Sequence, residues 1–200
     1  REDLGRRGDI TSEATIDSQQ NTELHIIARE SGIVCGVQLA RLAFALMNPD
    51  IEFTAQLQDG DALSKGSIIA SIRGNARAIL SAERTALNFL THLSGIATTT
   101  HELQSSISHT AAKITCTRKT IPGLRDVQKY AVRVGGGRNH RMGLDDAILI
   151  KDNHIALAGG DIIQTIQRAK AYAGHLIPVE VEVDTLEQLE QVLQEGVSLV

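Results

Sequence analysis

The chain has 200 residues, of which 42% are hydrophobic, 22% are charged and 2% are aromatic, with no Trp and a net charge of −4 at neutral pH. This is the composition of an ordinary soluble globular protein with one large domain or two small ones. Scarce aromatic side chains argue against single-stranded nucleic-acid binding, which depends on stacking. No apolar run reaches the roughly 18 residues of a membrane span, and no signal peptide opens the chain. We therefore expect neither a nucleic-acid nor a membrane partner.

Cysteine usage points to a reducing compartment. The chain contains two cysteines, Cys35 and Cys116, far apart in the sequence. Two isolated cysteines are too few for a disulfide framework or a zinc site. The sequence therefore predicts a cytoplasmic protein.

The first part of the chain, residues 1–74, has the pattern of a separate α+β unit. Apolar, partly β-branched runs predict strands over 23–29, 51–57 and 67–73. Between the first two, residues 36–48 carry apolar side chains at helical spacing, which predicts a helix.

Residues 76–109 are predicted to form two helices, because the apolar stripe of the first is followed by Gly95, a helix-stop signal. Glu83 falls within that stripe and Arg84 at its edge. The simpler interpretation is an internal Glu–Arg pair or an arginine that reaches out to solvent. The alternative is a helix that packs on another subunit and presents Arg84 to a ligand there.

From Lys113 onward, short apolar runs alternate with helical patterns. The predicted strands are 113–115, 147–150, 178–183 and 197–200, and the predicted helices are 124–134, 161–173 and 185–194. Such alternation is typical of parallel strands with crossover helices, and the polar residues after the strands suit an α/β barrel. Four strands do not close a barrel, and the strand-like run at the end favours a chain that is cut short.

Positive charge is concentrated in residues 113–154, which carry nine Lys or Arg against four Asp although the whole chain is acidic. Cations at the ends of apolar strands, with glycines between them, predict a pocket for phosphate or carboxylate groups. We interpret Arg125, Lys129 and Arg133, at i, i+4 and i+8, as a solvated helix face.

Other polar residues in this window have structural interpretations. Asp145 and Asp146 are candidates to cap a turn or to pair with Arg141, although metal binding is an alternative. His154 is interpreted as a structural hydrogen-bonding group rather than a base. The run Gly135 to Gly137 is weak evidence for a phosphate loop, because triple glycine often marks only a helix stop and a turn.

Four phrases resemble the quinolinate phosphoribosyltransferase family. They are SAERTALNFLTHLSGIAT (81–98), TRKTIPGLRDVQKYAVRVGGG (117–137), NHRMGLDDAILIKDNHI (139–155) and VEVEVDTLEQL (179–189). The likeness extends over essentially the whole chain. The spacing of TRKT, GGG, HR and IKDNH is a compound signature that is more specific than any single motif.

The resemblance implies the fold and the reaction. The expected fold is an N-terminal α+β sandwich domain (1–96, with the linking helix) followed by an α/β barrel domain (97–200), seven-stranded in the family and incomplete here. The implied reaction joins quinolinate to phosphoribosyl pyrophosphate, releases pyrophosphate and carbon dioxide, leaves nicotinate mononucleotide and requires Mg²⁺. The implied assembly is a homodimer with shared active sites. Further family residues, an acid and the 5′-phosphate loops, would lie beyond Val200.

The two carboxylates of quinolinate call for fixed guanidinium donors, which Arg118 and Arg141 can supply. The resemblance adds Arg84 from the partner subunit and His140 as a further donor, with Thr117 among the substrate-binding residues.

Lys119 and Lys151 are the candidates for stabilising the pyrophosphate leaving group, where charge grows in the transition state. Glu180 is expected to bind ribose hydroxyls or orient hydrated Mg²⁺. Glu182 shares its side-chain parity, but the resemblance selects Glu180. The candidate catalytic residues are therefore Lys119, Lys151 and Glu180.

Two other functions stay open at this point. One is a related phosphoribosyltransferase that acts on another aromatic acid, such as nicotinate. The other, from a different class, is a non-catalytic anion-binding module.

Overall fold

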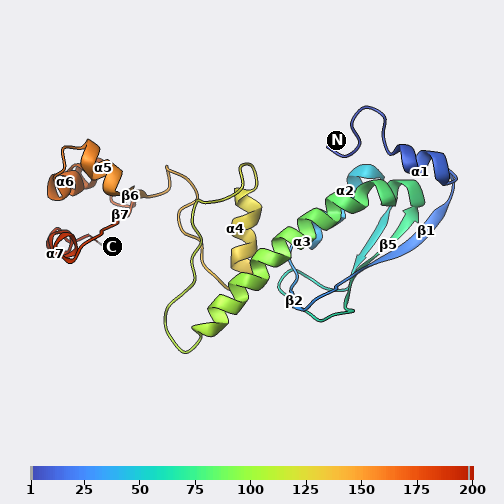
Figure 1. The fold of residues 1–200 in the computed structure, drawn as a ribbon, viewed down its shortest axis with the longest axis horizontal. Helices are drawn as coiled ribbons and strands as arrows, with labels where there is room; N and C mark the ends of the chain where they lie inside the picture. Colours follow the sequence, from blue (N-terminus) through green and yellow to red (C-terminus); the bar gives the residue numbers. More distant parts are fainter. Residues whose placement is uncertain (1, 198) are drawn as a thin grey trace. The chain divides into compact units, whose positions relative to one another are not determined.

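The computed structural model describes residues 2–197, 199 and 200. The chain forms two compact units (Figure 1). The first unit ends at His140 and the second begins at Arg141. Across the described residues, no helix has both the length and the apolar character needed to cross a membrane.

The first unit contains a three-stranded antiparallel sheet in the order β1-β5-β3, as the expected α+β pattern requires. The strands are β1 (Asn21–Ile27), β3 (Glu52–Ala55) and β5 (Ile68–Asn75). Their pairing runs from Asn21 opposite Asn75 and from Glu52 opposite Arg73. A two-stranded ladder, β2 (Gly32–Ile33) with β4 (Ala62–Leu63), and a short helix, α1 (Ile10–Thr15), were not expected from the sequence.

Two helices bury their apolar faces on this sheet. They are α2 (Val37–Met47) and α3 (Ala76–Ser106), which pack against each other and against β3 and β5 respectively. Phe44 of α2, Ile72 of β5 and Ile79 of α3 are at most 2% exposed in the shared core. Removal of this apolar surface from water is the main force that holds the unit together.

The prediction of two helices over 76–109 is wrong, because α3 runs through Gly95 as one helix of 31 residues. Glycine costs a helix only about 1 kcal/mol relative to alanine. On either side of Gly95, Leu93 and Ala97 are fully buried. This tertiary packing outweighs the local stop signal.

Helix α4 (Arg125–Val134) packs closely on α3, and two glycines permit the approach. A Cβ built on Gly135 overlaps the carbonyl oxygen of Ala97 and lies 2.7 Å from Thr100 Cβ. One built on Gly137 lies 2.8 Å from Thr100 Cγ2. The triple glycine therefore marks a helix end, as its structural interpretation had it, and is in addition a packing contact, which the sequence did not predict.

A carboxylate ties α4 to the start of α2. Asp59 Oδ1 accepts hydrogen bonds from the amides of Gly36 and Val37 at the N-terminus of α2, both at 2.9 Å. Its Oδ2 accepts from the hydroxyl of Tyr130 on α4, also at 2.9 Å. Anionic groups are favoured at helix N-termini, so this carboxylate is well placed to serve as the joint.

The second unit has the expected parallel strand and helix alternation. Strand β6 (Ile148–Ile150) pairs in parallel with β7 (Val179–Val181), with Ile148 opposite Val179. Three helices follow the strands, α5 (Asp152–Leu157), α6 (Ile162–Tyr172) and α7 (Leu186–Gln194). Ile150, Ile166, Val181 and Val192 form part of their shared core. Helix α5, like α1, was not expected from the sequence.

Among the described residues, the two other predicted strands contribute one parallel bridge each. Residues 113–115 contribute a bridge between Thr115 and Arg138. The expected strand over 197–200 includes Ser198, which lies outside the described residues, and Leu199 bridges Glu180. Among the described residues the strands therefore do not close a barrel, as expected from their number.

The contact between α3 and α4 yields a stability prediction. Gly135→Ala places a methyl group against Ala97 and Thr100, so we expect a loss of about 1–3 kcal/mol in the free energy of unfolding. The φ of Gly135 is −72°, which alanine also adopts, so the effect is steric. Gly95→Ala, whose Cβ meets nothing within 4 Å, should instead gain about 0.5–1 kcal/mol. Urea unfolding measures both, and equal effects in the two variants would contradict this packing.

A second prediction concerns alkaline pH. Partial burial of the phenol, in a residue that is still 39% exposed, and the hydrogen bond to Asp59 raise the pKa of Tyr130 to about 12. An unfolded phenol loses its proton near about 10, so the unfolded state binds fewer protons and the free energy of unfolding falls between these values. Burial also raises the pKa of the Cys35 thiol to about 12. Cys35 therefore contributes its own alkaline loss of stability, and this contribution is present in every tyrosine variant.

We expect Tyr130→Phe to flatten this alkaline loss of stability. Tyr172→Phe is the matched control, since Tyr172 is the other tyrosine of the chain and is 87% exposed. Denaturant unfolding at a series of pH values above about 9 provides the measurement. An unchanged slope in Tyr130→Phe would remove Tyr130 as a cause of the alkaline loss.

Candidate functional site

The predicted TRKT residues lie in a tight turn after a short extended segment. The amide of Lys119 donates to Thr117 Oγ1 at 3.0 Å, and the amide of Thr120 donates to the carbonyl of Arg118 at 2.9 Å. A threonine side chain that bonds an amide two residues on is a recognised turn device. Thr117 therefore has a local structural role in addition to the proposed contact with substrate.

The register of one parallel bridge relates this turn to His140. The parallel bridge joins Thr115 to Arg138, and the Arg138 amide donates to the Ile114 carbonyl at 2.8 Å. Two residues further along the two parallel segments stand Thr117 and His140. Both lie at the carboxyl end of this local pairing, the edge where α/β folds gather their ligands.

Helix α4 holds both segments. Gln128 Oε1 accepts from the Ile121 amide at 3.0 Å, and its amide nitrogen lies 2.8 Å from His92 Nε2. The adjacent Lys129 donates through Nζ to the carbonyl of His140 at 2.9 Å. Successive residues of one helix thus anchor the turn after Lys119 and the backbone at His140.

The prediction of a solvated cationic face on α4 is therefore wrong for Lys129, which is 1% exposed. Arg125 is partly buried and donates from Nε to Thr120 Oγ1 at 3.1 Å. Arg133 is exposed, with its guanidinium 5.8 Å from the centre of the Tyr130 ring. The i, i+4 and i+8 spacing predicted a solvated face wrongly because loops pack on α4 and cover Lys129. The periodicity of a helix does not show contacts with loops.

Arg118 carries an unsatisfied donor. Its Nε is buried and makes no hydrogen bond within the described part of the chain. A buried donor without a partner costs about 1–3 kcal/mol, so an exogenous acceptor would be stabilising at this position. Arginine presents its donors in a planar fork that matches a carboxylate or phosphate.

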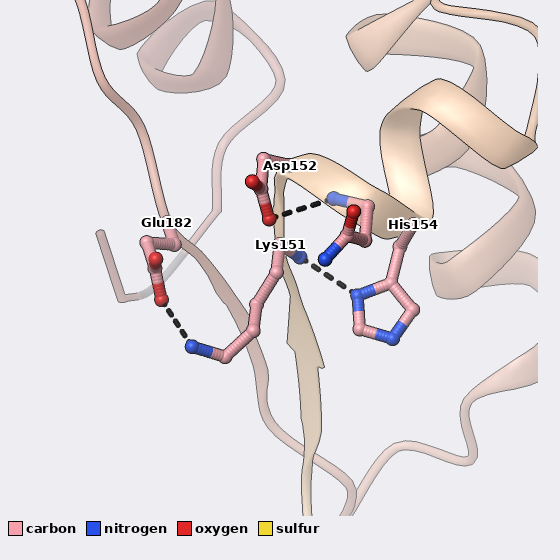
Figure 2. A network of polar contacts seen from close by, with 5 residues as sticks. Lys151, Asp152, His154 and Glu182 are labelled. Atoms are coloured by element: carbon pink, nitrogen blue, oxygen red, sulfur yellow. Dashed lines mark hydrogen bonds and ion pairs between the residues drawn. The ribbon is translucent and has the colours of Figure 1, made fainter.

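The second unit places Lys151 and Glu182 at the carboxyl ends of β6 and β7, where they form an ion pair (Figure 2). Lys151 Nζ donates to Glu182 Oε2 at 2.6 Å, and the two side chains are 43% and 52% exposed. An ion pair this exposed contributes only about 0–1 kcal/mol to stability. A ligand of higher negative charge can therefore displace Glu182 from Lys151 at small cost.

His154 fixes the start of α5. Its Nδ1 accepts a hydrogen bond from the Lys151 amide at 2.9 Å, as Figure 2 shows. An imidazole nitrogen that accepts a hydrogen bond from an amide carries no proton of its own. The structural interpretation of His154 is confirmed.

Glu180 lies on β7, opposite Leu149 of β6. Alternation along the strands puts Glu180 on the same side as Glu182, whereas Val179 and Val181 face the buried core. Glu180 is half-buried. Strand parity thus puts both acids on one side, and Glu182 makes the contact with Lys151. Which of the two acids binds ribose hydroxyls or Mg²⁺ stays a prediction.

Arg141 is held by the loop that follows it. Its Nη1 donates to the carbonyl of Ala147 at 2.8 Å. In the same loop Asp146 Oδ2 accepts from the Met142 amide at 2.8 Å, which confirms the interpretation of an aspartate that caps a turn.

Arg84 is exposed on α3, and Glu83 beside it is partly buried. Within the described residues no hydrogen bond or ion pair joins Glu83 to Arg84, so the internal pair was the wrong interpretation. The exposed position of Arg84 agrees with the other form of the simpler interpretation, an arginine that reaches out to solvent, and the subunit contact stays a prediction.

The candidate residues fall into both units. Arg84, Thr117, Arg118, Lys119 and His140 belong to the first, and Arg141, Lys151 and Glu180 to the second. Each unit by itself presents cations at the carboxyl ends of parallel segments. Such an arrangement is suited to binding anions, and the residues include both fork-shaped and point-charge donors.

Comparison with known proteins identifies the family. The model of the quinolinate phosphoribosyl transferase N-terminal domain matches residues 9–94, and that of the C-terminal domain matches residues 96–200. The chain belongs to this family. The two matches together cover nearly the whole sequence, so the expected two-domain fold class is confirmed.

Curated relatives and a solved structure agree with this family. A probable nicotinate-nucleotide pyrophosphorylase (carboxylating) of Bacillus subtilis (strain 168) is 45% identical over all of this chain and 68% of its own length. A chloroplastic protein of the same name from Arabidopsis thaliana is 45% identical over 96% of this chain and 56% of its own. The crystal structure of NadC from Streptococcus pyogenes superposes with a TM-score of 0.93 at 41% identity, over 98% of this chain and 69% of that one.

The relatives also indicate how much of a whole protein this chain spans. It covers between about half and 70% of the curated sequences that it matches. The activity, substrates and partners of a whole protein of this family are accordingly proposals for this chain.

Sequence reasoning missed two groups that organise the site. Gln128 and Lys129 sit on α4 and bond backbone groups of the site loops. Their nearly complete burial was the missing information, since the same residue types on a helix are usually solvated. A buried polar pair at adjacent helical positions is visible only once the loops are in place.

Proposed function

We propose that this chain takes part in phosphoribosyl transfer from phosphoribosyl pyrophosphate to quinolinate, with decarboxylation. The pyridine nitrogen forms a bond to the ribose carbon as the bond to pyrophosphate breaks. The carbon–carboxylate bond then breaks, a proton takes its place, and nicotinate mononucleotide, pyrophosphate and carbon dioxide are the products. The names of the relatives support this reaction.

The observation that carries the proposal is the buried Nε of Arg118, which has no acceptor among the described residues. A carboxylate of quinolinate would supply that acceptor, and His140 would be a further donor to it. The second carboxylate is assigned to Arg141. Within its own unit, the His140 carbonyl is held by Lys129 and the Arg141 side chain by the Ala147 carbonyl, which reduces the ordering that each donor needs when the substrate binds.

Lys119 and Lys151 are assigned to the pyrophosphate. Negative charge on this group grows in the transition state, so fixed cations lower the barrier more than they tighten substrate binding. Release of Lys151 from Glu182 costs little because their pair is exposed.

Mg²⁺ is proposed as the metal, with Glu180 as its carboxylate or as a partner of the ribose hydroxyls. Mg²⁺ usually keeps several waters and takes one or two carboxylates together with substrate phosphates. The residues fit this mode, since strand parity puts Glu180, on β7, and Glu182, just after β7, on one side. The described part of the chain has no cluster of three or more His, Cys or acidic residues that would form an all-protein cage. When bound, the ion would neutralise charge on the pyrophosphate.

The proposed setting is the cytoplasm, and the proposed assembly is a homodimer. The two free cysteines support a reducing compartment. The exposed position of Arg84 on α3 supports a site completed by a second subunit.

Paired recognition of two carboxylates tests the function. In a chain extended to the length of its relatives, we expect calorimetry to find binding of quinolinate and of phthalate, and much weaker binding of nicotinate. Arg118→Lys keeps the charge but loses the planar fork, which should reduce quinolinate affinity about tenfold.

Arg138→Lys is the matched control, because Arg138 is exposed and lies in the same cation-rich stretch. Its hydrogen bonds with Ile114 and Cys116 involve only its backbone. It should leave quinolinate binding unchanged. Tighter binding of nicotinate than of quinolinate would instead favour a phosphoribosyltransferase for another aromatic acid. Absence of binding to all three ligands would favour another anion-binding role.

The shared site is tested by subunit mixing. We expect Arg84→Ala and Lys151→Ala dimers to be nearly inactive, because each lacks a cation in every composite site. In a mixed dimer one site carries both lesions and the other neither, so an equal mixture should restore about a quarter of the wild-type sites. Pyrophosphate release after subunit exchange measures this. No recovery after proven exchange would place Arg84 in the site of its own subunit or outside it.

A further inference from the structure

Lys129 is a buried lysine that the reaction, as assigned above, does not use. It is 1% exposed and is among the largest fully buried side chains of the described residues. Burial of an ammonium group carries a large desolvation cost, and Met would fill a similar volume without it. The cost indicates that the donor itself has a purpose at this position.

The helix that carries Lys129 is a fixed support. Gly135 and Gly137 bring α4 into direct contact with α3, and the Tyr130 hydroxyl is bonded to Asp59 at 2.9 Å. Asp59 in turn holds the first amides of α2. A side chain that extends from such a support has a well-defined anchor at its base.

The other end of Lys129 holds the backbone of a candidate site residue. Hydrogen bonds of the parallel pairing fix Ile114, Cys116 and Arg138. Two residues beyond Arg138, the carbonyl of His140 accepts from Lys129 Nζ at 2.9 Å. A charge-assisted hydrogen bond is about twice as strong as a neutral one, so it restrains this peptide group firmly.

We propose that Lys129 is a positioning residue that holds the backbone at His140 so that its imidazole is oriented for a carboxylate of the substrate. The proposal rests on the proposed function, in which His140 is a donor to quinolinate. Lys129 acts through the main chain and does not touch the substrate. Small displacements of a binding group lose much of its contribution, which is why such a support has a measurable effect.

The test uses Lys129→Met in a chain of the relatives' full length. Met removes the donor and keeps the side chain's approximate volume, so we expect the Kd for quinolinate to rise about tenfold. The KM for phosphoribosyl pyrophosphate should stay within about twofold, because Lys119 and Lys151 keep their places. Hydrogen exchange of peptides that cover residues 136–142 should become faster.

The control and a double variant separate positioning from general damage. Arg133→Met removes an exposed cation one turn later on the same helix and should change neither quinolinate binding nor exchange. In a His140→Ala background, Lys129→Met should cost no further quinolinate affinity, because its effect passes through His140. A purely structural loss would instead add to that of His140→Ala.

Each outcome decides the proposal. A folded Lys129→Met protein with wild-type quinolinate affinity overturns it, and so does a fully additive loss in the double variant. If Lys129→Met does not fold, Lys129→Arg takes its place, and affinity and exchange must then change together. Failure of the wild-type protein to bind quinolinate would overturn the proposed function and with it the ligand assigned to His140. Normal wild-type binding with an unaffected Lys129→Met would overturn the positioning role alone.

Discussion

The close approach of α4 to α3 is the constraint on which the site of the first unit depends. Two positions without side chains, Gly135 and Gly137, let the end of α4 meet Ala97 and Thr100 on α3. Protein interiors are close-packed, so this contact fixes the helix in one place. From that place adjacent residues of α4 reach the turn that follows Lys119 and the carbonyl of His140.

Much of the architecture could be predicted because hydrophobic periodicity reports burial directly. The strands of the first sheet and the helices that became α2, α4, α6 and α7 were placed within a few residues. The break at Gly95 failed because local propensity, worth about 1 kcal/mol, competes with burial on both sides of the residue. The short helix α5 was missed because six residues carry too little periodic signal.

The site was predicted unevenly for a related physical reason. Cations at strand ends are visible in a sequence because apolar runs mark the strands, and this made Arg118, Lys119 and Lys151 candidates. Residues that support the site from a helix give no such signal, since Lys and Gln on helices usually face solvent. The choice between Glu180 and Glu182 also depends on where Lys151 extends, which strand parity alone leaves open.

Lys129, Arg118 and Lys151 are held in ways that match three different tasks. Lys129 is buried and bonded to a backbone carbonyl, so its place changes little when a ligand binds. Arg118 has a buried donor with no acceptor among the described residues, which leaves part of its binding capacity for a ligand. Lys151 is exposed and paired with a carboxylate that a more highly charged anion can replace. The environment of each cation, and not its charge alone, therefore sets its task. Lys129 supports the backbone, Arg118 can recognise an anion, and Lys151 can exchange its carboxylate partner for another anion.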